Sequence, residues 1–367
     1  MVRVVRLERT VSWSQTRRDT NFAIPGYSIS AIISRRGRKS KIFLSVVIPV
    51  VKAAFVPFSA IGGNPANAGA TRLSSVLPCT VSDTATAHPN RARPVSEDTY
   101  FEAASLTKPF FARLVFELCD EGVIELTRPL IEYEPDIVPS TDARFLKATA
   151  ADVLCHATGL QNWGRLPMEL RFATGEGFGY SGMGYYYLQQ IIEKLTETRL
   201  DALLQQRLMD KLGMDSAAMI WTGALRHRLA RTADENGDME PERSTARHSM
   251  GMEPNAAFSL YVTIKDYPKF IMGVLNEPDF ARRVRSVKNS AGHGVEWGLG
   301  WGLYKEMLWH WGDNGGFKSL VCLDPNTKDA LLIHTNGFNG LNVCYDIAQL
   351  VTGESFADIA AMIAVAE

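Results

Sequence analysis

Two side chains with complementary chemistry lie three residues apart in the segment FEAASLTKPF: Ser105 and Lys108. This spacing puts both side chains on one face of a helix, one turn apart. A serine hydroxyl becomes a nucleophile when a base takes its proton, and a lysine in an apolar, charge-crowded place has a pKa low enough to help. The serine N–H at a helix N-terminus also stabilises developing negative charge. The pair predicts nucleophilic catalysis, and an N-cap serine beside a surface lysine is the simpler alternative.

Two further segments carry side chains that fit the same chemistry. Tyr180, in GYSG, directly precedes a predicted helix, where its phenol can carry a proton if a nearby ammonium lowers its pKa. His310 and Gly312, in HWGDNGGF, precede a predicted strand. Gly312 lets a substrate approach the backbone, and the N–H of Asp313 can act as a second oxyanion donor. The simpler alternatives are an aromatic residue at the rim of the core and a glycine turn beside a buried histidine.

Three glycines near Tyr180 match the G-x-G-x-x-G pattern of a dinucleotide-binding turn: Gly177, Gly179 and Gly182. That turn requires a buried hydrophobic strand directly before it. The preceding MELRFATGE contains no apolar run of four residues, so it does not read as such a strand. We therefore predict no dinucleotide cofactor.

In chain order, the S-x-x-K, Y-S-G and H-x-G motifs resemble the serine hydrolase family of class C β-lactamases, D-Ala-D-Ala carboxypeptidases and related esterases. The resemblance extends to IPGYSISAI, PVSEDTYFEAASLTKP, LCHATGL, LGMDSAAM and WGLGWG, and it covers residues 24–34 and about 95–340. It implies the α+β fold of β-lactamases and penicillin-binding proteins. It also implies hydrolysis through an acyl-enzyme, with no metal and no organic cofactor.

The resemblance implies a role for each of the residues singled out above. Ser105 would be the acylated nucleophile, and Lys108 and Tyr180 would form the general-base system, with the holder of the proton left open. The N–H groups of Ser105 and Asp313 would form the oxyanion hole. His310 stands where many relatives carry the lysine of a K-T-G motif and some carry a histidine. His156, in LCHATGL, is interpreted as a structural residue that caps a turn.

Gly182 departs from the family pattern, because relatives that act on peptides or β-lactams usually carry an asparagine there. That asparagine holds the acylamino group of the substrate, and its absence costs a bound acylamide about 1–3 kcal/mol of hydrogen bonding. We therefore expect an ester or small amide as substrate, and we expect Gly182→Asn to shift activity towards acylamides. The alternative in the same class is a β-lactamase or D-amino-acid peptidase. The alternative from another class is a non-catalytic binding module, which the intact motifs disfavour.

The hydrophobic pattern places helices in the middle of the chain and strands at both ends. A helix is expected over 105–121, and others are expected after Thr149, from Asp201 to Gly213, near Asp266 and over the last 25 residues. Short strands are expected at 25–34, 295–304, 317–324 and 329–336. The simplest architecture is α+β, with an antiparallel sheet built from residues 1–104 and 290–367 and a helical lobe at 105–289 between them. Within the sheet lobe, residues 1–22 and 42–97 are left as loop, insertion or anchor.

Composition limits the partners and the environment. The chain has 367 residues, 46% of them hydrophobic, and a net charge of −1, which indicates a globular protein with no general affinity for nucleic acid. A small-molecule ester or amide is the expected partner, and the oligomeric state is open. The five cysteines are odd in number and widely spaced, which argues against a disulfide framework and favours the cytoplasm. The absence of an H-E-x-x-H pattern in the sequence argues against a metal site.

The segment IFLSVVIPVVKAAFVPFSAI at 42–61 is the exception to this picture, because it follows the basic RRGRKSK. Basic residues followed by an apolar run have the order of an export signal or anchor, so export or anchoring through residues 35–70 is the alternative localisation. Membrane contact is expected only through 42–61. An internal strand with a long insertion is the other interpretation.

Overall fold

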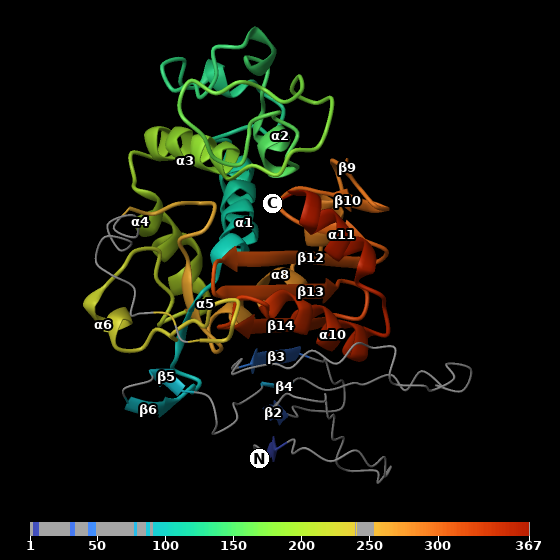
Figure 1. Cartoon of the computed structure of the whole chain (residues 1–367). Helices are drawn as coiled ribbons and strands as arrows, with labels where there is room; N and C mark the ends of the chain where they lie inside the picture. Colours follow the sequence, from blue (N-terminus) through green and yellow to red (C-terminus); the bar gives the residue numbers. More distant parts are fainter. Residues whose placement is uncertain are drawn as a thin grey trace.

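The computed structural model describes residues 95–238, 240 and 253–366, together with six short strands before residue 95. An eight-stranded sheet forms one side of the molecule (Figure 1). Its strands, in spatial order, are β4 (Leu77–Pro78), β3 (Phe43–Ile48), β14 (Asp329–Thr335), β13 (Phe317–Asp324), β12 (Met307–Asn314), β11 (Gly302–Tyr304), β10 (Val295–Trp297) and β9 (Asn289–Gly292). The strands from β14 to β9 are antiparallel, as expected.

The N-terminal contribution to this sheet differs in detail from the expectation. Residues 43–48, inside the apolar run 42–61, form β3, which pairs in parallel with β14 and β4. The run therefore contains an internal strand, as one of the two interpretations proposed. The expected strand at 25–34 contains β2 (Ser30–Ile33), which pairs with β1 (Arg3–Arg6) in a separate two-stranded sheet. Two more short strands, β5 (Thr86–His88) and β6 (Arg91–Pro94), pair with each other.

The C-terminal helix α10 lies against β13 and β14 of the sheet, whereas α2 and α3 lie above the sheet and α4 to α6 beside it (Figure 1). The α-helices are α1 (Thr107–Asp120), α2 (Ala150–Leu154), α3 (Gly182–Thr196), α4 (Leu200–Leu204), α5 (Asp210–Leu212), α6 (Gly223–Arg226), α8 (Tyr267–Asn276), α9 (Phe280–Val284), α10 (Gly340–Thr352) and α11 (Ala357–Ala366). The other helical turns are η3 (Ala104–Leu106), η4 (Leu130–Glu132), η5 (Ala143–Phe145) and the π-turn η6 (Gln205–Met209).

Several helix boundaries follow from the residues that the sequence pointed to. Thr149 begins α2 with a capping box, because its hydroxyl accepts from the N–H of Asp152 while that carboxylate accepts from the N–H of Thr149. Gly213 ends α5 in the left-handed conformation. The last 25 residues do not form one helix as expected, because Gly353 adopts φ 74° and separates α10 from α11.

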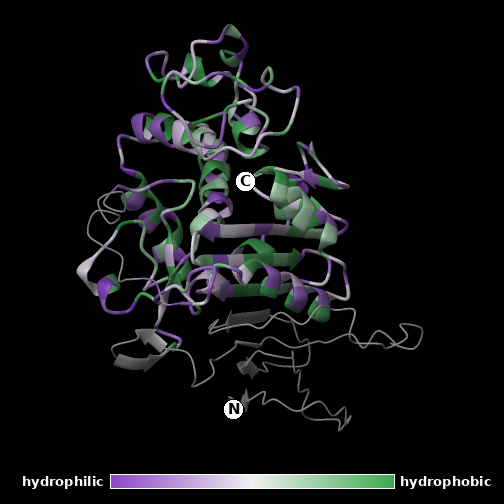
Figure 2. Ribbon diagram, in the orientation of Figure 1, coloured by the Kyte–Doolittle hydropathy of each residue, from purple (hydrophilic) through white to green (hydrophobic). Residues whose placement is uncertain are grey.

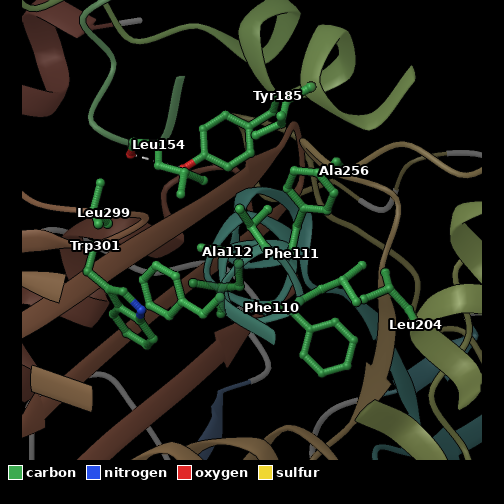
Figure 3. Packing of buried hydrophobic residues seen from close by; sticks show 14 of the residues in the cluster. Phe110, Phe111, Ala112, Leu154, Tyr185, Leu204, Ala256, Leu299 and Trp301 are labelled. Atoms are coloured by element: carbon green, nitrogen blue, oxygen red, sulfur yellow. Dashed lines mark hydrogen bonds between the residues drawn. The ribbon is translucent and has the colours of Figure 1, made fainter. Parts of the chain in front are cut away.

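The core is built around α1, which is buried on nearly all sides. Phe110, Phe111 and Ala112 of α1 contact residues from many parts of the chain, as Figure 3 shows. The neighbours labelled there are Leu154, Tyr185, Leu204, Ala256, Leu299 and Trp301. Hydrophobic colouring accordingly runs along α1, whereas α3 alternates between hydrophobic and hydrophilic residues (Figure 2).

A short strand pair brings a distant segment beside the start of α1. The strand β7 (Tyr100–Glu102) pairs in antiparallel with β8 (Tyr261–Thr263). Just past this pair, the N–H of Ala103 donates to the carbonyl of Leu260 at 2.8 Å. This pairing places residues 254–260 next to the S-x-x-K segment.

The parts of the chain that the structure describes contain no helix that is both long and apolar enough to cross a membrane. The four described cysteines are unpaired, and Cys79 lies outside the described residues. No group of three or more potential metal ligands occurs among the described side chains.

Candidate active site

The S-x-x-K motif forms a tight turn at the N-terminus of α1. Ser105 lies in η3 and Lys108 in the first turn of α1, and the Lys108 Nζ donates to the Ser105 Oγ at 3.1 Å. The Thr107 hydroxyl between them donates to the Ala104 carbonyl and accepts from the Leu260 N–H. Pro109 is tolerated because it falls in the first helical turn, where N–H groups have no intrahelical partner. The expected convergence of the hydroxyl and the amine is therefore present.

The backbone at this turn is strained and tightly packed. Ala104, directly before Ser105, adopts φ 51°, which is unfavourable for a residue with a Cβ atom. The strand β12 presses on the same turn, because a Cβ atom at Gly312 would lie only 2.5 Å from the Ala103 carbonyl oxygen. Packing of β12 against the nucleophile turn therefore requires a glycine at 312. The expected approach of a substrate to the Gly312 backbone remains a prediction.

Lys108 is deeply buried at the start of α1. Its side chain is 2% exposed, and its Nζ also donates to the Ala257 carbonyl at 2.9 Å. Among the described residues no carboxylate forms an ion pair with it. Burial therefore lowers the pKa of Lys108 to about 7, since the charged form loses its hydration. Near neutral pH a substantial fraction of this amine is unprotonated and can accept a proton.

Tyr180 lies against this amine, and its backbone is held from both sides by His156. The Lys108 Nζ is 4.7 Å from the centroid of the Tyr180 ring. The His156 carbonyl accepts from the Gly179 N–H at 2.9 Å, and the His156 Nδ1 accepts from the Ser181 N–H at 3.1 Å. The two rings lie 4.3 Å apart between centroids. His156 is thus a structural residue, as expected, and the residues it holds are the two neighbours of Tyr180.

His310 is buried in β12 beside these rings. The segment HWGDN forms the end of β12, and it also precedes the strand predicted from the sequence, which is β13. The His310 Nδ1 lies 2.7 Å from the Trp311 carbonyl, which can only accept, so Nδ1 carries the proton and Nε2 is an acceptor. Burial and the nearby Lys108 hold the pKa of His310 well below its usual value. The residue is consequently neutral at pH 7, unlike the lysine of a K-T-G motif.

Asp313 lies near the end of β12, and its carboxylate forms an ion pair with Lys318 of β13. Its Oδ1 also accepts from the Gly315 N–H at 3.0 Å, in the turn between the two strands. The side chain therefore stabilises the hairpin. The use of the Asp313 N–H as an oxyanion donor remains a prediction.

Gly182 is the first residue of α3, and an aromatic ring occupies the space beside it. A Cβ atom at Gly182 would lie 2.3 Å from Cζ2 of Trp163. The Gly182 N–H donates to the Asn162 Oδ1 at 2.8 Å. An asparagine at 182 would collide with the indole, so the predicted effect of Gly182→Asn on acylamides requires the indole to move as well. Sequence reasoning missed Asn162 and Trp163, and the absent asparagine was the only sign that another group fills this space.

The G-x-G-x-x-G match also has a packing explanation. Residues 155–181 contain no strand, so the glycines do not follow one. Cβ atoms at Gly177 and Gly179 would lie 3.2 Å and 3.1 Å from the ring of Phe172. These glycines allow the loop to fold closely over that ring.

Comparison with known proteins places this site in a family. The model of the Beta-lactamase family matches residues 75–350. The chain belongs to this family. Its sequence is 23% identical over 304 residues to penicillin-binding protein 4 of Amycolatopsis lactamdurans, covering 71% of this chain and 78% of that protein. It is 27% identical over 159 residues to esterase EstB of Burkholderia gladioli, covering 35% and 40%.

A third relative, an uncharacterized protein of Alkalihalophilus pseudofirmus, is 28% identical over 182 residues, covering 49% of this chain and half of that protein. The family contains β-lactamases, carboxypeptidases and esterases, all of them serine hydrolases. Membership therefore supports the prediction of a serine hydrolase that works through an acyl-enzyme.

Solved structures show the same fold. D-alanine carboxypeptidase AmpC of Burkholderia cenocepacia superposes with a TM-score of 0.58 at 18% identity, covering 70% of this chain and 86% of that one. The octameric penicillin-binding protein homologue of Pyrococcus abyssi gives 0.61 at 18% identity, covering 74% and 70%. The α+β fold of β-lactamases and penicillin-binding proteins is thereby confirmed.

Proposed function

We propose that the protein hydrolyses small uncharged esters, with Ser105 as nucleophile and Lys108 as general base. The observation that carries this proposal is the 3.1 Å contact between the Lys108 Nζ and the Ser105 Oγ, made by an amine whose pKa is lowered to about 7. A base with a pKa near the working pH is the most effective one for proton transfer. The hydrogen bonds of Thr107 and the packing of Gly312 against Ala103 hold the turn around Ser105 in the geometry that such a transfer requires.

The reaction proceeds in two halves. In the first, the unprotonated Nζ of Lys108 takes the hydroxyl proton while the Ser105 Oγ bonds to the ester carbonyl carbon. The oxyanion is stabilised by the N–H of Ser105 and by that of Asp313. The bond to the leaving alcohol then breaks, and that alcohol takes the proton, with Tyr180 beside the amine as its carrier. In the second half, water attacks the acyl-enzyme, gives its proton to the same base, and releases the carboxylic acid and the free hydroxyl of Ser105.

The polar groups of the site favour an uncharged ester over a carboxylate-bearing amide. Position 182 offers no carboxamide to an acylamino group, and Trp163 fills the space where one would stand. His310 is neutral, and Lys318 on the neighbouring strand is already paired with Asp313. The second candidate, β-lactamase or D-amino-acid peptidase activity, is favoured by the names of the fold relatives.

The test combines covalent labelling with a substrate panel. A small fluorophosphonate is expected to add one adduct to the intact protein, at Ser105, and the exposed Ser286 serves as a matched control. Ser105→Ala should abolish the adduct, and Ser286→Ala should retain it. The panel comprises p-nitrophenyl esters, nitrocefin and D-Ala-D-Ala peptides, with ester turnover expected to dominate. Unchanged labelling of Ser105→Ala would refute the nucleophile, and faster turnover of nitrocefin or the peptides would refute the substrate class.

A further inference from the structure

Trp163 stands out because it is a large aromatic side chain that remains 46% exposed beside the buried site. Its position is set by its neighbour Asn162, which is fastened to the start of α3. The Asn162 Oδ1 accepts from the Gly182 N–H at 2.8 Å, and its carbonyl accepts from the Met183 N–H at 2.9 Å. The indole is therefore held beside Gly182, which lies two residues after Tyr180 in the chain.

The absence of a side chain at Gly182 is what admits the indole. A Cβ atom at 182 would lie within 2.8 Å of three indole atoms, Cζ2, Cε2 and Cη2. The glycine and the tryptophan thus form a matched pair, in which one removes a side chain and the other fills the space. The result replaces a position that could carry a polar amide with an apolar surface.

A second aromatic ring extends this surface towards the base. The Trp163 and Phe258 rings pack edge to face, with 5.7 Å between their centroids. Phe258 directly follows Ala257, whose carbonyl accepts from the Lys108 Nζ. Its own carbonyl lies 3.5 Å from the Asn314 Nδ2, at the end of β12. The ring pair therefore joins two segments that border the site: residue 163, packed on Gly182 near Tyr180, and residue 258, next to the Ala257 carbonyl that accepts from Lys108.

From this arrangement we infer that Trp163 is a specificity-determining residue, which together with Phe258 forms an aromatic wall that selects esters with apolar acyl chains. The inference rests on the proposed ester hydrolysis and specifies which acyl groups of the ester are preferred. An exposed aromatic face next to a reaction centre gains most when an apolar group covers it. Acyl groups of four to eight carbons bring methylenes against the indole, whereas an acetyl group does not reach beyond the carbonyl.

The experiment compares the acyl-chain preference of three proteins on p-nitrophenyl acetate, butyrate, hexanoate and octanoate. The wild type is expected to favour hexanoate over acetate by roughly 10-fold or more in kcat/KM. Trp163→Ala should reduce this ratio to about 3-fold or less, mainly through a higher KM for the longer esters. Leu350→Ala, which removes another exposed apolar side chain on α10, is the matched control and should keep the wild-type ratio.

A second set of variants tests the pairing with Gly182. Gly182→Asn alone should lose activity on all esters because the indole blocks the new side chain. Trp163→Ala with Gly182→Asn should recover activity and gain on N-acylglycine esters relative to plain alkanoyl esters. Equal ratios of N-acylglycine to alkanoyl ester activity in Trp163→Ala and in the double variant would overturn the pairing.

The outcomes separate this inference from the proposed function. If wild-type Ser105 is labelled by the fluorophosphonate and hydrolyses p-nitrophenyl acetate, but Trp163→Ala keeps the full chain-length preference, only the aromatic wall is refuted. If wild-type Ser105 is not labelled at all, the proposed function fails and the wall fails with it. Circular dichroism of each variant identifies misfolding, and Trp163→Phe, which keeps an aromatic ring, should retain an intermediate preference.

Discussion

Two buried lysines near β12 show how differently the same residue type can be used. Among the described residues, Lys108 on α1 donates to two uncharged acceptors, the Ser105 hydroxyl and the Ala257 carbonyl. Lys318 on β13 forms an ion pair with Asp313, and its ammonium lies 4.9 Å from the centroid of the Phe338 ring. The two amines therefore differ in their partners. Burial lowers the pKa of Lys108 to about 7, and among the described residues no carboxylate is paired with it to stabilise its charge.

The largest expected effect concerns activity. Lys108→Met should lower kcat/KM for p-nitrophenyl esters by about 1,000-fold, because no base remains to take the hydroxyl proton. In the wild type, kcat/KM should rise with pH and level off, with an apparent pKa close to 7. The reason is that Lys108 is protonated below its pKa of about 7 and accepts a proton only above it.

Lys318→Met supplies the contrast for this measurement, since it removes the other buried amine and should leave the pKa of the rate profile in place. Stopped-flow ester hydrolysis between pH 5.5 and 9 measures both variants. A wild-type profile that is flat between pH 6 and 8 would contradict the assignment of Lys108 as the base.

The next effect concerns stability, because substitutions of the two lysines should change the free energy of unfolding in opposite directions. Lys108→Met should raise the free energy of unfolding at pH 6 by on the order of 2–4 kcal/mol, because burial lowers the folded-state pKa from 10.5 to about 7. Below pH 7 both states are protonated and the penalty is complete. As the pH rises from 7 towards 10.5 the unfolded state alone binds the proton, so the wild type gains stability and the difference shrinks.

Lys318→Met should instead lower the free energy of unfolding by about 1–3 kcal/mol, since it leaves the Asp313 carboxylate without its partner. Adding Asp313→Asn should recover part of this loss. Urea denaturation at pH 6 and pH 9 measures each variant. The comparison fails if both lysine substitutions shift stability in the same direction at pH 6.

The smallest expected effect tests how Tyr180 is positioned. His156 adopts φ 57°, which asparagine also tolerates, so His156→Asn keeps the backbone conformation. The substitution replaces the imidazole, whose Nδ1 accepts from the Ser181 N–H, by a shorter side chain. We expect kcat to fall about 10-fold with little change in KM, because the ring beside the amine shifts while substrate contacts remain.

His334→Asn is the matched control, because His334 is equally buried and its Nδ1 lies 2.7 Å from the Ser319 hydroxyl on the neighbouring strand. It should lose stability without a selective fall in kcat. Equal kcat values for the two histidine variants would show that His156 has no particular influence on Tyr180.

The sequence was informative where local pattern decides the structure. The capping residue Thr149, the strand at 317–324 and the start of α1 all follow from neighbouring residues. The contact between Ser105 and Lys108 follows for the same reason, since it spans a single helical turn. The family resemblance then joined these residues with Tyr180 and His310, which the fold places beside one another.

The features that escaped prediction depend on distant contacts. Trp163 reaches Gly182 from 19 positions away, in a loop with no hydrophobic period, so only the folded structure brings them together. The glycines of HWGDNGGF suggested a turn, yet Gly312 lies inside β12 because the strand must approach Ala103. The joining of the two ends of the chain in one sheet was predicted, but the parallel direction of β3 relative to β14 leaves no local signal.

The central position of α1 has a consequence for how the protein loses activity. The helix that carries Lys108 has ten buried side chains, and seven of them belong to the same hydrophobic core cluster. Local opening is confined to elements with few buried contacts, so this helix separates from its surroundings only when the whole molecule unfolds. Inactivation by heat is then a single cooperative event, and residual turnover reports directly on the population of native molecules.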